Sequence, residues 1–188
     1  MEELYKKVEL FIRDSYTKIG KEIHIQHALR TVYWVEQLNL NCDLALRIAA
    51  VGHDIEKAFR QKDMEDKKQS VGYTDEEFLR PHEERSSEII RNFLSEQGAD
   101  SGIISKVCRL ISRHEEGGDE EQNILRDADS VSFFEVYPAR MIGKVAEVGK
   151  QKVRDKFDWM YNRIGSKKVQ KIVKPMYENA NQNLATKV

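Results

Sequence analysis

The fold is decided by residues 23–57, which read IHIQHALRTVYWVEQLNLNCDLALRIAAVGHDIEK. Two apolar stripes run through this stretch at the three- and four-residue spacing of a helix face. Asp43 separates them and carries a side chain that caps the first turn of a helix well. The stretch therefore predicts two successive helices, with His27 on the first and His53 on the second. The apolar residues of the two stripes are Ala28, Val32, Val35, Leu38, Leu44, Ile48, Val51 and Ile55.

Helical periodicity continues on both sides of this stretch, and we find no segment with the apolar–polar alternation of a strand. Pro81 fits the first turn of a helix, and Gly117 ends another, which leaves His114 in its last turn. We therefore expect an all-α protein, a helical bundle in a single domain over residues 1–188. The other expected helices cover residues 2–19, 81–97, 101–116, a segment around 124–131, and 139–148, 157–164 and 169–177.

The composition is typical of a globular protein in water, with 40% hydrophobic and 34% charged residues. No apolar stretch approaches the roughly 20 residues that cross a bilayer, and the acidic start is unlike a signal peptide. We therefore expect a cytoplasmic protein without a membrane partner. Cys42 and Cys108 have no CxxC spacing, so neither a zinc thiolate site nor a disulfide framework is indicated.

Charge is unevenly distributed, although the net charge is −1. Residues 1–143 carry 20 Lys and Arg against 28 Asp and Glu, whereas residues 144–188 carry 11 against 4. Trp159, Tyr161 and Tyr177 lie among these basic residues, as in a nucleic-acid-binding surface. Their helical spacing favours a packed core with solvated lysines, so we do not expect nucleic-acid binding.

Four of the five histidines occupy settings suited to a metal site. On a helix, the adjacent His53 and Asp54 are about 100° apart, close enough for both to reach one cation, with Asp54 able to bridge to a second. The ordered recurrence of His, His-Asp, His, His and Asp favours a metal centre. The sequence settings are HALR at 27–30, HDIEK at 53–57, PHEE at 81–84, SRHEE at 112–116 and RDAD at 126–129.

This ordered pattern, over residues 23–134, resembles the HD superfamily of metal-dependent phosphohydrolases, and the resemblance implies an HD-domain-like helical bundle. His27 matches the start of its HxxR motif, and Asp129 matches its terminal Ala-Asp pair. The resemblance implies a binuclear site in which Asp54 bridges two ions, and it assigns no role to the C-terminal helical extension, residues 139–188. The implied ligands are His27, His53, Asp54 and Asp129 for the first metal, with His82 and His114 as the additional ligands of the binuclear branch.

Mixed imidazole and carboxylate ligation suits Mn, Fe, Ni, Co or Zn better than Ca, so the expected cofactors are one or two divalent transition-metal ions. Such ions activate water for attack on phosphorus, with Asp54 as the catalytic residue. The implied function is hydrolysis of a small phosphate ester, with a nucleotide as the leading substrate. HDIEK replaces the HDIGK of the cyclic-dinucleotide phosphodiesterases in this superfamily, and their GYP signature is missing, so we do not expect that substrate. The alternative function is a non-catalytic metal-binding helical module.

Several further residues have expected roles around this ligand set. Lys57 and Arg30 each follow a ligand histidine by one helical turn and are predicted to bind the substrate phosphate. His24 is not expected to bind metal, and Asp127 points about 200° away from Asp129 and is only a reserve ligand. Residues 60–80 are polar without an apolar period and are interpreted as a lid. Weaker candidates for the phosphate are Arg126, Lys67 and Lys68.

Overall fold

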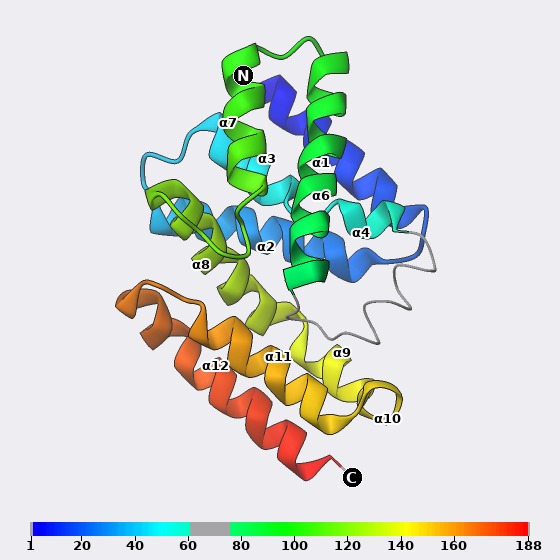
Figure 1. Cartoon of the computed structure of the whole chain (residues 1–188), viewed down its shortest axis with the longest axis vertical. Coiled ribbons are helices and arrows are strands. Elements are labelled where there is room, and N and C mark those ends of the chain that lie inside the picture. The colour runs from blue at the N-terminus through cyan, green and yellow to red at the C-terminus, as the bar shows by residue number, and fades with distance from the viewer. Residues whose placement is uncertain (1, 61–75, 188) are drawn as a thin grey trace.

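The structure is a computed structural model that describes residues 2–60 and 76–187 (Figure 1). In these two ranges it contains helices and no strand, which confirms the all-α fold. Of the predicted lid over residues 60–80, residues 61–75 lie outside the described residues, and Lys67 and Lys68 are among them, whereas residues 76–80 are helical and not a loop. The described helices are α1 (Glu2–Thr17), α2 (Glu22–Leu38), α3 (Leu44–Gly52), α4 (Glu56–Phe59), α6 (Glu76–Glu96), α7 (Ser101–Ile111), α8 (Glu120–Val136), α9 (Pro138–Gly143), α10 (Val145–Val148), α11 (Lys150–Asn162) and α12 (Lys167–Thr186).

Helix α3 lies at the centre of the larger core and is buried on nearly every side. Its sequence, LALRIAAVG, contains a single charged residue and so has no wide polar face to present to water. Helices α1, α2, α7 and α8 pack around it. Asp43 caps its first turn as predicted, accepting a hydrogen bond from the Leu46 N–H at 3.0 Å. Because α3 ends inside the molecule, the residues that follow it, His53 and Asp54, are buried.

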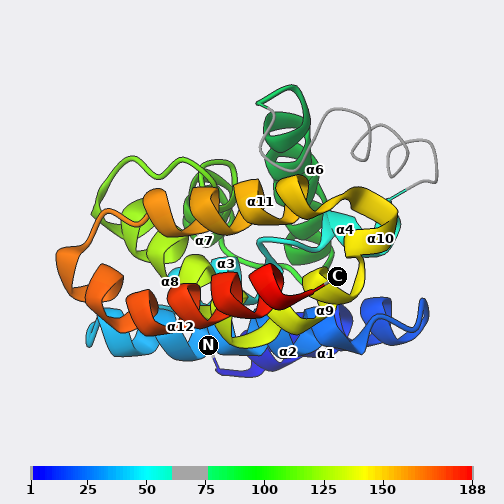
Figure 2. The same ribbon diagram turned by 90° about the horizontal axis from the view of Figure 1, so that it is seen from below.

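A second core joins the C-terminal half of α8 to the last two helices. Helices α11 and α12 lie side by side and run in opposite directions, as Figures 1 and 2 show. Phe157 and Met160 of α11 and Val173 of α12 pack with Phe133 and Phe134 of α8. Helix α8 also contributes to the larger core through its first half. The C-terminal extension is therefore packed on the helix that carries Asp129.

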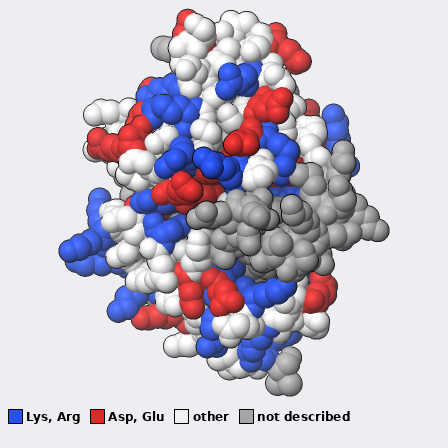
Figure 3. Space-filling model, viewed as in Figure 1, with Lys and Arg blue, Asp and Glu red and all other residues white. Residues whose placement is uncertain are grey.

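The surface over the C-terminal helices mixes both signs of charge on the face shown in Figure 3. Over the lower part of that view, where α11 and α12 lie, Lys and Arg alternate with Asp and Glu instead of forming one continuous basic area. Among the described residues, no helix combines the length and the apolar character needed to cross a bilayer.

Two helices that precede predicted ligands end earlier than the sequence predicts. Helix α7 ends at Ile111, so His114 lies in the turn after the helix and not in its last turn. Helix α3 ends at Gly52, so His53 is its C-cap and Asp54 lies in a turn. The prediction of a continuous helix was wrong at both points, because an apolar stripe does not mark the residue at which a helix ends.

Two other helices extend beyond their predicted bounds, and each contains a proline. Pro81 lies inside α6, which begins before it, and not in a first turn. Helix α12 contains Pro175, as its predicted range 169–177 does, and continues to Thr186 because its buried stripe continues; this packing outweighs the cost of the missing N–H. The buried residues of that stripe are Val169, Val173, Ala180 and Leu184.

Candidate metal centre

Six buried side chains from distant parts of the chain meet at one centre. Helix α2 supplies a histidine, the turn after α3 supplies an adjacent histidine and aspartate, α6 and the turn after α7 supply one histidine each, and α8 supplies an aspartate. None of the six is more than 6% exposed. The structure therefore brings all six predicted ligands together. They are His27, His53, Asp54, His82, His114 and Asp129.

His53 and His114 are oriented by the ends of the helices that precede them. The Nδ1 atom of His53 lies 2.8 Å from the carbonyl oxygen of Ala50. The Nδ1 atom of His114 lies 2.8 Å from the carbonyl oxygen of Ile111. A carbonyl oxygen only accepts a hydrogen bond, so Nδ1 is the protonated donor in both rings. In the neutral form of each ring, the lone pair of Nε2 therefore points toward the centre.

His82 and His27 are oriented in the same way by side chains. The Nδ1 atom of His82 lies 2.8 Å from Oε2 of Glu56, a buried carboxylate that also pairs with Arg60. The Nδ1 atom of His27 lies 2.7 Å from the Ser132 hydroxyl of α8. Hydrogen bonds of this kind at the far nitrogen orient metal-binding histidines in proteins. All four rings thus present Nε2 to the same space.

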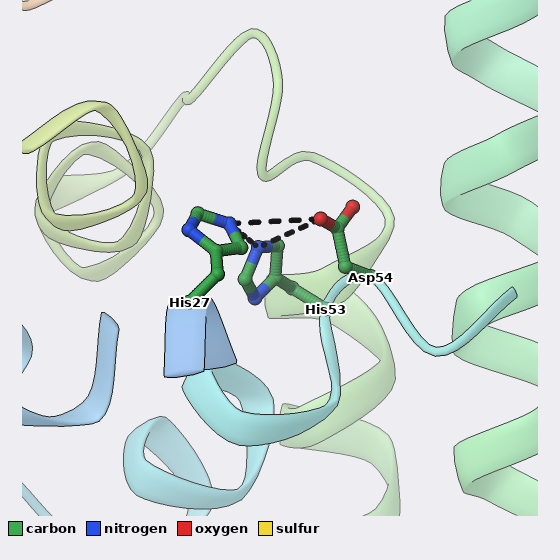
Figure 4. Close-up of side chains that lie close together, drawn as sticks. All are labelled: His27, His53 and Asp54. Carbon is green, nitrogen blue, oxygen red and sulfur yellow. Dashed lines mark hydrogen bonds and ion pairs between the residues drawn. The ribbon is translucent and has the colours of Figure 1, made fainter. Parts of the chain in front are cut away.

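Nitrogen and oxygen atoms with free electron pairs are crowded together in that space. The Nε2 atom of His27 lies 3.3 Å from Nε2 of His53, and both lie 3.6 Å from Oδ2 of Asp54 (Figure 4). The Nε2 atom of His27 is also 3.0 Å from Oδ1 of Asp129. The Nε2 atom of His82 lies 2.9 Å from Oδ1 of Asp54. Such a buried group of electron-pair donors is stabilised by a cation.

His114 has a buried nitrogen atom without a hydrogen-bond partner among the described residues. This atom, Nε2, lies 3.8 Å from Oε1 of Glu115, which is too far for a hydrogen bond. Leaving a buried acceptor unsatisfied costs about 1–3 kcal/mol. A metal ion at the centre would supply the missing partner, so the donor set fits a metal.

Nearby positive charges keep both aspartates of the centre ionised. Burial raises the pKa of Asp54, but the ammonium of Lys57 together with His53 and His82 outweighs burial, and the pKa lies well below its usual range. Burial also raises the pKa of Asp129, whereas the guanidinium of Arg163 lowers it, and the resulting pKa lies below its usual range. Burial lowers the pKa of His114 to about 4. At neutral pH these three groups are therefore in the forms that bind metal ions.

The two remaining ligand histidines at the α8 side of the centre differ in their pKa. Burial lowers the pKa of His27. Burial also acts on His53, but the adjacent carboxylates of Asp54 and Asp129 outweigh it and raise its pKa. A proton on His53 thus supplies part of the positive charge that the two carboxylates attract, and metal binding would displace that proton.

Arg163 is a component of the centre that sequence reasoning missed. It is the C-cap of α11, and its guanidinium pairs with the carboxylates of Asp129 and Glu115 and donates to the Ser130 hydroxyl at 2.9 Å. Its side chain is 6% exposed. Because Arg163 lies 34 residues from Asp129 and in no recognisable motif, only the packing of α11 on α8 reveals it. It fixes one oxygen of Asp129 and leaves the other toward the histidines.

The structure separates the two predicted phosphate-binding residues. Lys57 pairs with Asp54 and lines the cavity at the centre. Arg30 instead forms two hydrogen bonds with Glu135 of α8, at 2.7 and 2.8 Å, and is not among the residues that line the cavity. Arg126 also lies outside the lining and pairs with its neighbour Asp127. Neither Arg30 nor Arg126 is therefore placed to contact a ligand in this cavity.

Asp127 and His24 have structural partners of their own. The carboxylate of Asp127 accepts hydrogen bonds from the N–H groups of Gly165 and Ser166, at 3.0 and 2.9 Å, and so anchors the turn between α11 and α12. The Nδ1 atom of His24 lies 2.6 Å from the Tyr137 hydroxyl, and His24 belongs to none of the ligand groups at the centre. Both placements agree with the expectation that neither residue is a metal ligand.

A cavity of about 240 Å³ opens from the metal centre. Ligand residues on one side and side chains of α9, α10 and α11 on another side line it, so the C-terminal extension helps to form the site. The lining mixes cationic and apolar groups. Its residues are Lys21, His24, His27, Asp54, Lys57, Arg60, Leu79, His82, Glu115, Asp129, Phe133, Tyr137, Arg140, Met141, Lys144, Glu147, Val148, Lys156 and Met160.

Glu83, next to His82 on α6, gives the fold a pH dependence of its own. Burial raises its pKa to about 8, and its Oε1 accepts a hydrogen bond from the Glu115 N–H at 2.8 Å. Since the folded-state pKa lies above the unfolded value, its contribution to stability is full below about pH 4.5 and is lost as the pH rises to 8. We expect Glu83→Gln, which keeps the acceptor without the charge, to remove this loss.

The relevant measurement is urea denaturation of both proteins at pH 5 and pH 8 in the presence of a chelator. The stability of Glu83→Gln relative to the wild type should increase between these two pH values by on the order of 2 kcal/mol. A relative stability that is the same at both pH values would show that Glu83 is ionised in the folded protein at pH 5.

Fold and site together define an all-α protein with a buried histidine–aspartate centre. A family model described as a domain of unknown function (DUF4202) matches residues 12–184. The chain therefore belongs to this family. The match includes all six residues of the centre together with Arg163. No curated protein and no solved structure shows significant similarity to the chain.

Proposed function

We propose that this protein is a metal-dependent phosphohydrolase of the HD type, and that it hydrolyses a small phosphate ester, with nucleotides as the leading class. The proposal is supported above all by one observation: four imidazole Nε2 atoms and two carboxylates converge in a buried space that opens into a cavity with cationic side chains. Binding of metal to this donor set and access of an anionic substrate to it are the two requirements of such an enzyme.

The six donors would supply the ligands of two divalent transition-metal ions. Three groups of residues have ligand atoms within 4.8 Å of one another. Asp54 belongs to two of these groups and has one oxygen toward His82 and the other toward His27 and His53, as a bridging ligand requires. The three groups are His27, His53 and Asp54; His53, His114 and Asp129; and Asp54, His82 and His114.

Two ions held in this way would lower the pKa of a water molecule and polarise a phosphoryl oxygen. The chain contributes position and charge. Lys57 places an ammonium group beside Asp54 at the cavity wall, where it attracts the phosphate of the ester. Arg163 and Glu56 hold Asp129 and His82 in place, so the ligands keep their positions when the ester enters.

Metal content is the first test of this function. We expect close to two divalent ions per chain in protein purified without chelator, and close to one in His82→Ala, because His82 belongs to just one of the three ligand groups found among the described residues. His24→Ala is the matched control, since this histidine lines the same cavity without belonging to a ligand group, and it should keep both ions. Elemental analysis of the three proteins measures this directly.

Hydrolysis is the second test. With Mn or Fe added, the wild type should release phosphate from nucleotides or from a generic aryl phosphate, and a chelator should abolish the release. Two ions bound without hydrolysis of any ester would instead favour the metal-binding module, and a chain that binds no metal would contradict both functions.

A further inference from the structure

Apart from Lys21, the cations that line the cavity fall into two groups. Beside the metal centre, Lys57 is paired with Asp54 and Arg60 is paired with Glu56. On the wall formed by α9, α10 and α11, three cations make no ion pair with any described residue. These are Arg140, Lys144 and Lys156. The positive charge on this wall is therefore available to an anionic ligand.

Lys156 is the most informative of the three because it is only partly accessible to solvent. Its Nζ atom lies over the indole of Trp159, 4.1 Å from the ring centroid, and 6.0 Å from the ring centroid of Phe133. The acidic group with the largest effect on the pKa of Lys156 is Glu115, whose carboxylate is already paired with Arg163. Burial lowers the pKa of Lys156 to about 8, which reflects the cost of a half-buried ammonium without a counterion.

The remaining side chains of this wall fit an anion with an organic body. Glu147 is its one acidic residue and is exposed, so it does not neutralise Lys156. Met141, Val148 and Met160 supply an apolar surface next to the cations. A cavity of about 240 Å³ bounded by the metal centre and by this wall has room for a small molecule that contacts both.

We infer that Arg140, Lys144 and Lys156 form a second anion subsite, which binds a phosphate group of the substrate that is not hydrolysed. This inference rests on the proposed function, in which the first phosphate lies at the metal centre. The substrate then carries at least two phosphate groups separated by an apolar or organic body. The C-terminal extension, to which the sequence pattern assigns no role, selects that substrate.

The test compares two probes that a phosphoesterase does not cleave, because their phosphorus is bonded to carbon. Butylphosphonate carries one phosphonate group, and butane-1,4-diphosphonate carries two. Their affinities for the full metal-loaded chain are measured by isothermal titration calorimetry. The wild type should bind the diphosphonate about tenfold or more tightly than the monophosphonate, the ratio typical of one added charge-assisted contact.

Three variants locate the second contact. Lys156→Met should reduce affinity for the diphosphonate about tenfold while leaving the monophosphonate unchanged, and Arg140→Gln, at an exposed position, should act in the same direction without affecting folding. Lys171→Met is the matched control, because this lysine lies exposed on α12 outside the cavity. It should bind both probes as the wild type does.

The outcomes separate this inference from the proposed function. Equal loss of affinity for both probes in Lys156→Met and Arg140→Gln, or no loss for either probe, would overturn the subsite. If the wild type binds the diphosphonate more tightly, and this preference depends on Lys156, but it hydrolyses no phosphate ester, the anion subsite is supported and the proposed hydrolase function is contradicted. If the protein hydrolyses phosphate esters but binds both probes equally tightly, the hydrolase function is supported and the subsite is contradicted.

Discussion

Replacement of Asp54 by alanine is expected to remove nearly all bound metal and to reduce phosphate release by about 10³-fold or more. The reason is the position of its two oxygens, since Oδ1 lies 2.9 Å from Nε2 of His82 and Oδ2 lies 3.6 Å from Nε2 of both His27 and His53. Loss of this one carboxylate therefore takes a ligand from both parts of the centre, whereas loss of His82 affects one part. Elemental analysis and an assay of phosphate release measure the two effects.

The control for this variant is Asp43→Ala, at the other end of α3. Asp43 caps the helix and pairs with Lys106 but takes no part in the centre. We expect it to lower the free energy of unfolding by about 1 kcal/mol and to leave the metal content unchanged. If Asp54→Ala retained both ions, Asp54 would not bridge them, and the proposed arrangement of the ligands would be wrong.

Replacement of Arg163 by methionine is expected to have the largest effect on stability, a decrease of about 3–5 kcal/mol in the free energy of unfolding of the metal-free protein. Its guanidinium is the partner of two buried carboxylates, those of Asp129 and Glu115, and the substitution removes this shared positive charge from both. Urea denaturation measures the decrease. Arg154→Met, at an exposed position of the same helix, should change stability by no more than about 0.5 kcal/mol.

The pH dependence of this variant provides a separate check. Burial raises the pKa of Glu115, but Arg163 together with Lys156 and His114 outweighs burial and lowers this pKa to about 2, and the pKa of Asp129 is also lowered. The stabilisation by the ion pairs is therefore present above the ordinary carboxyl pKa of about 4 and is lost as the pH falls toward 2. The stability difference between the wild type and Arg163→Met should accordingly shrink between pH 7 and pH 3. A constant difference would mean that Arg163 stabilises the fold through packing and not through charge.

The helical fold and the residues of the centre were predicted from two different features of the sequence. Helices follow from apolar spacing, which is local, and the order of histidines and aspartates is itself visible in the chain. Arg163 and Lys156 gave no comparable signal, because each meets the site only after α11 packs on α8. The assignment of Arg30 relied on its position one turn after His27, and spacing does not reveal that Glu135 lies within its reach.

The residues of the centre lie far apart along the chain, so a newly made protein acquires them at different times. All six donor residues have been synthesised once Asp129 has emerged, but the guanidinium that fixes Asp129 follows 34 residues later. Chains fold progressively during synthesis, so an N-terminal portion that ends before α11 would hold its donors with unbalanced negative charge. The centre and its cavity wall are thus complete only after α11 and α12 have been synthesised and have docked on α8.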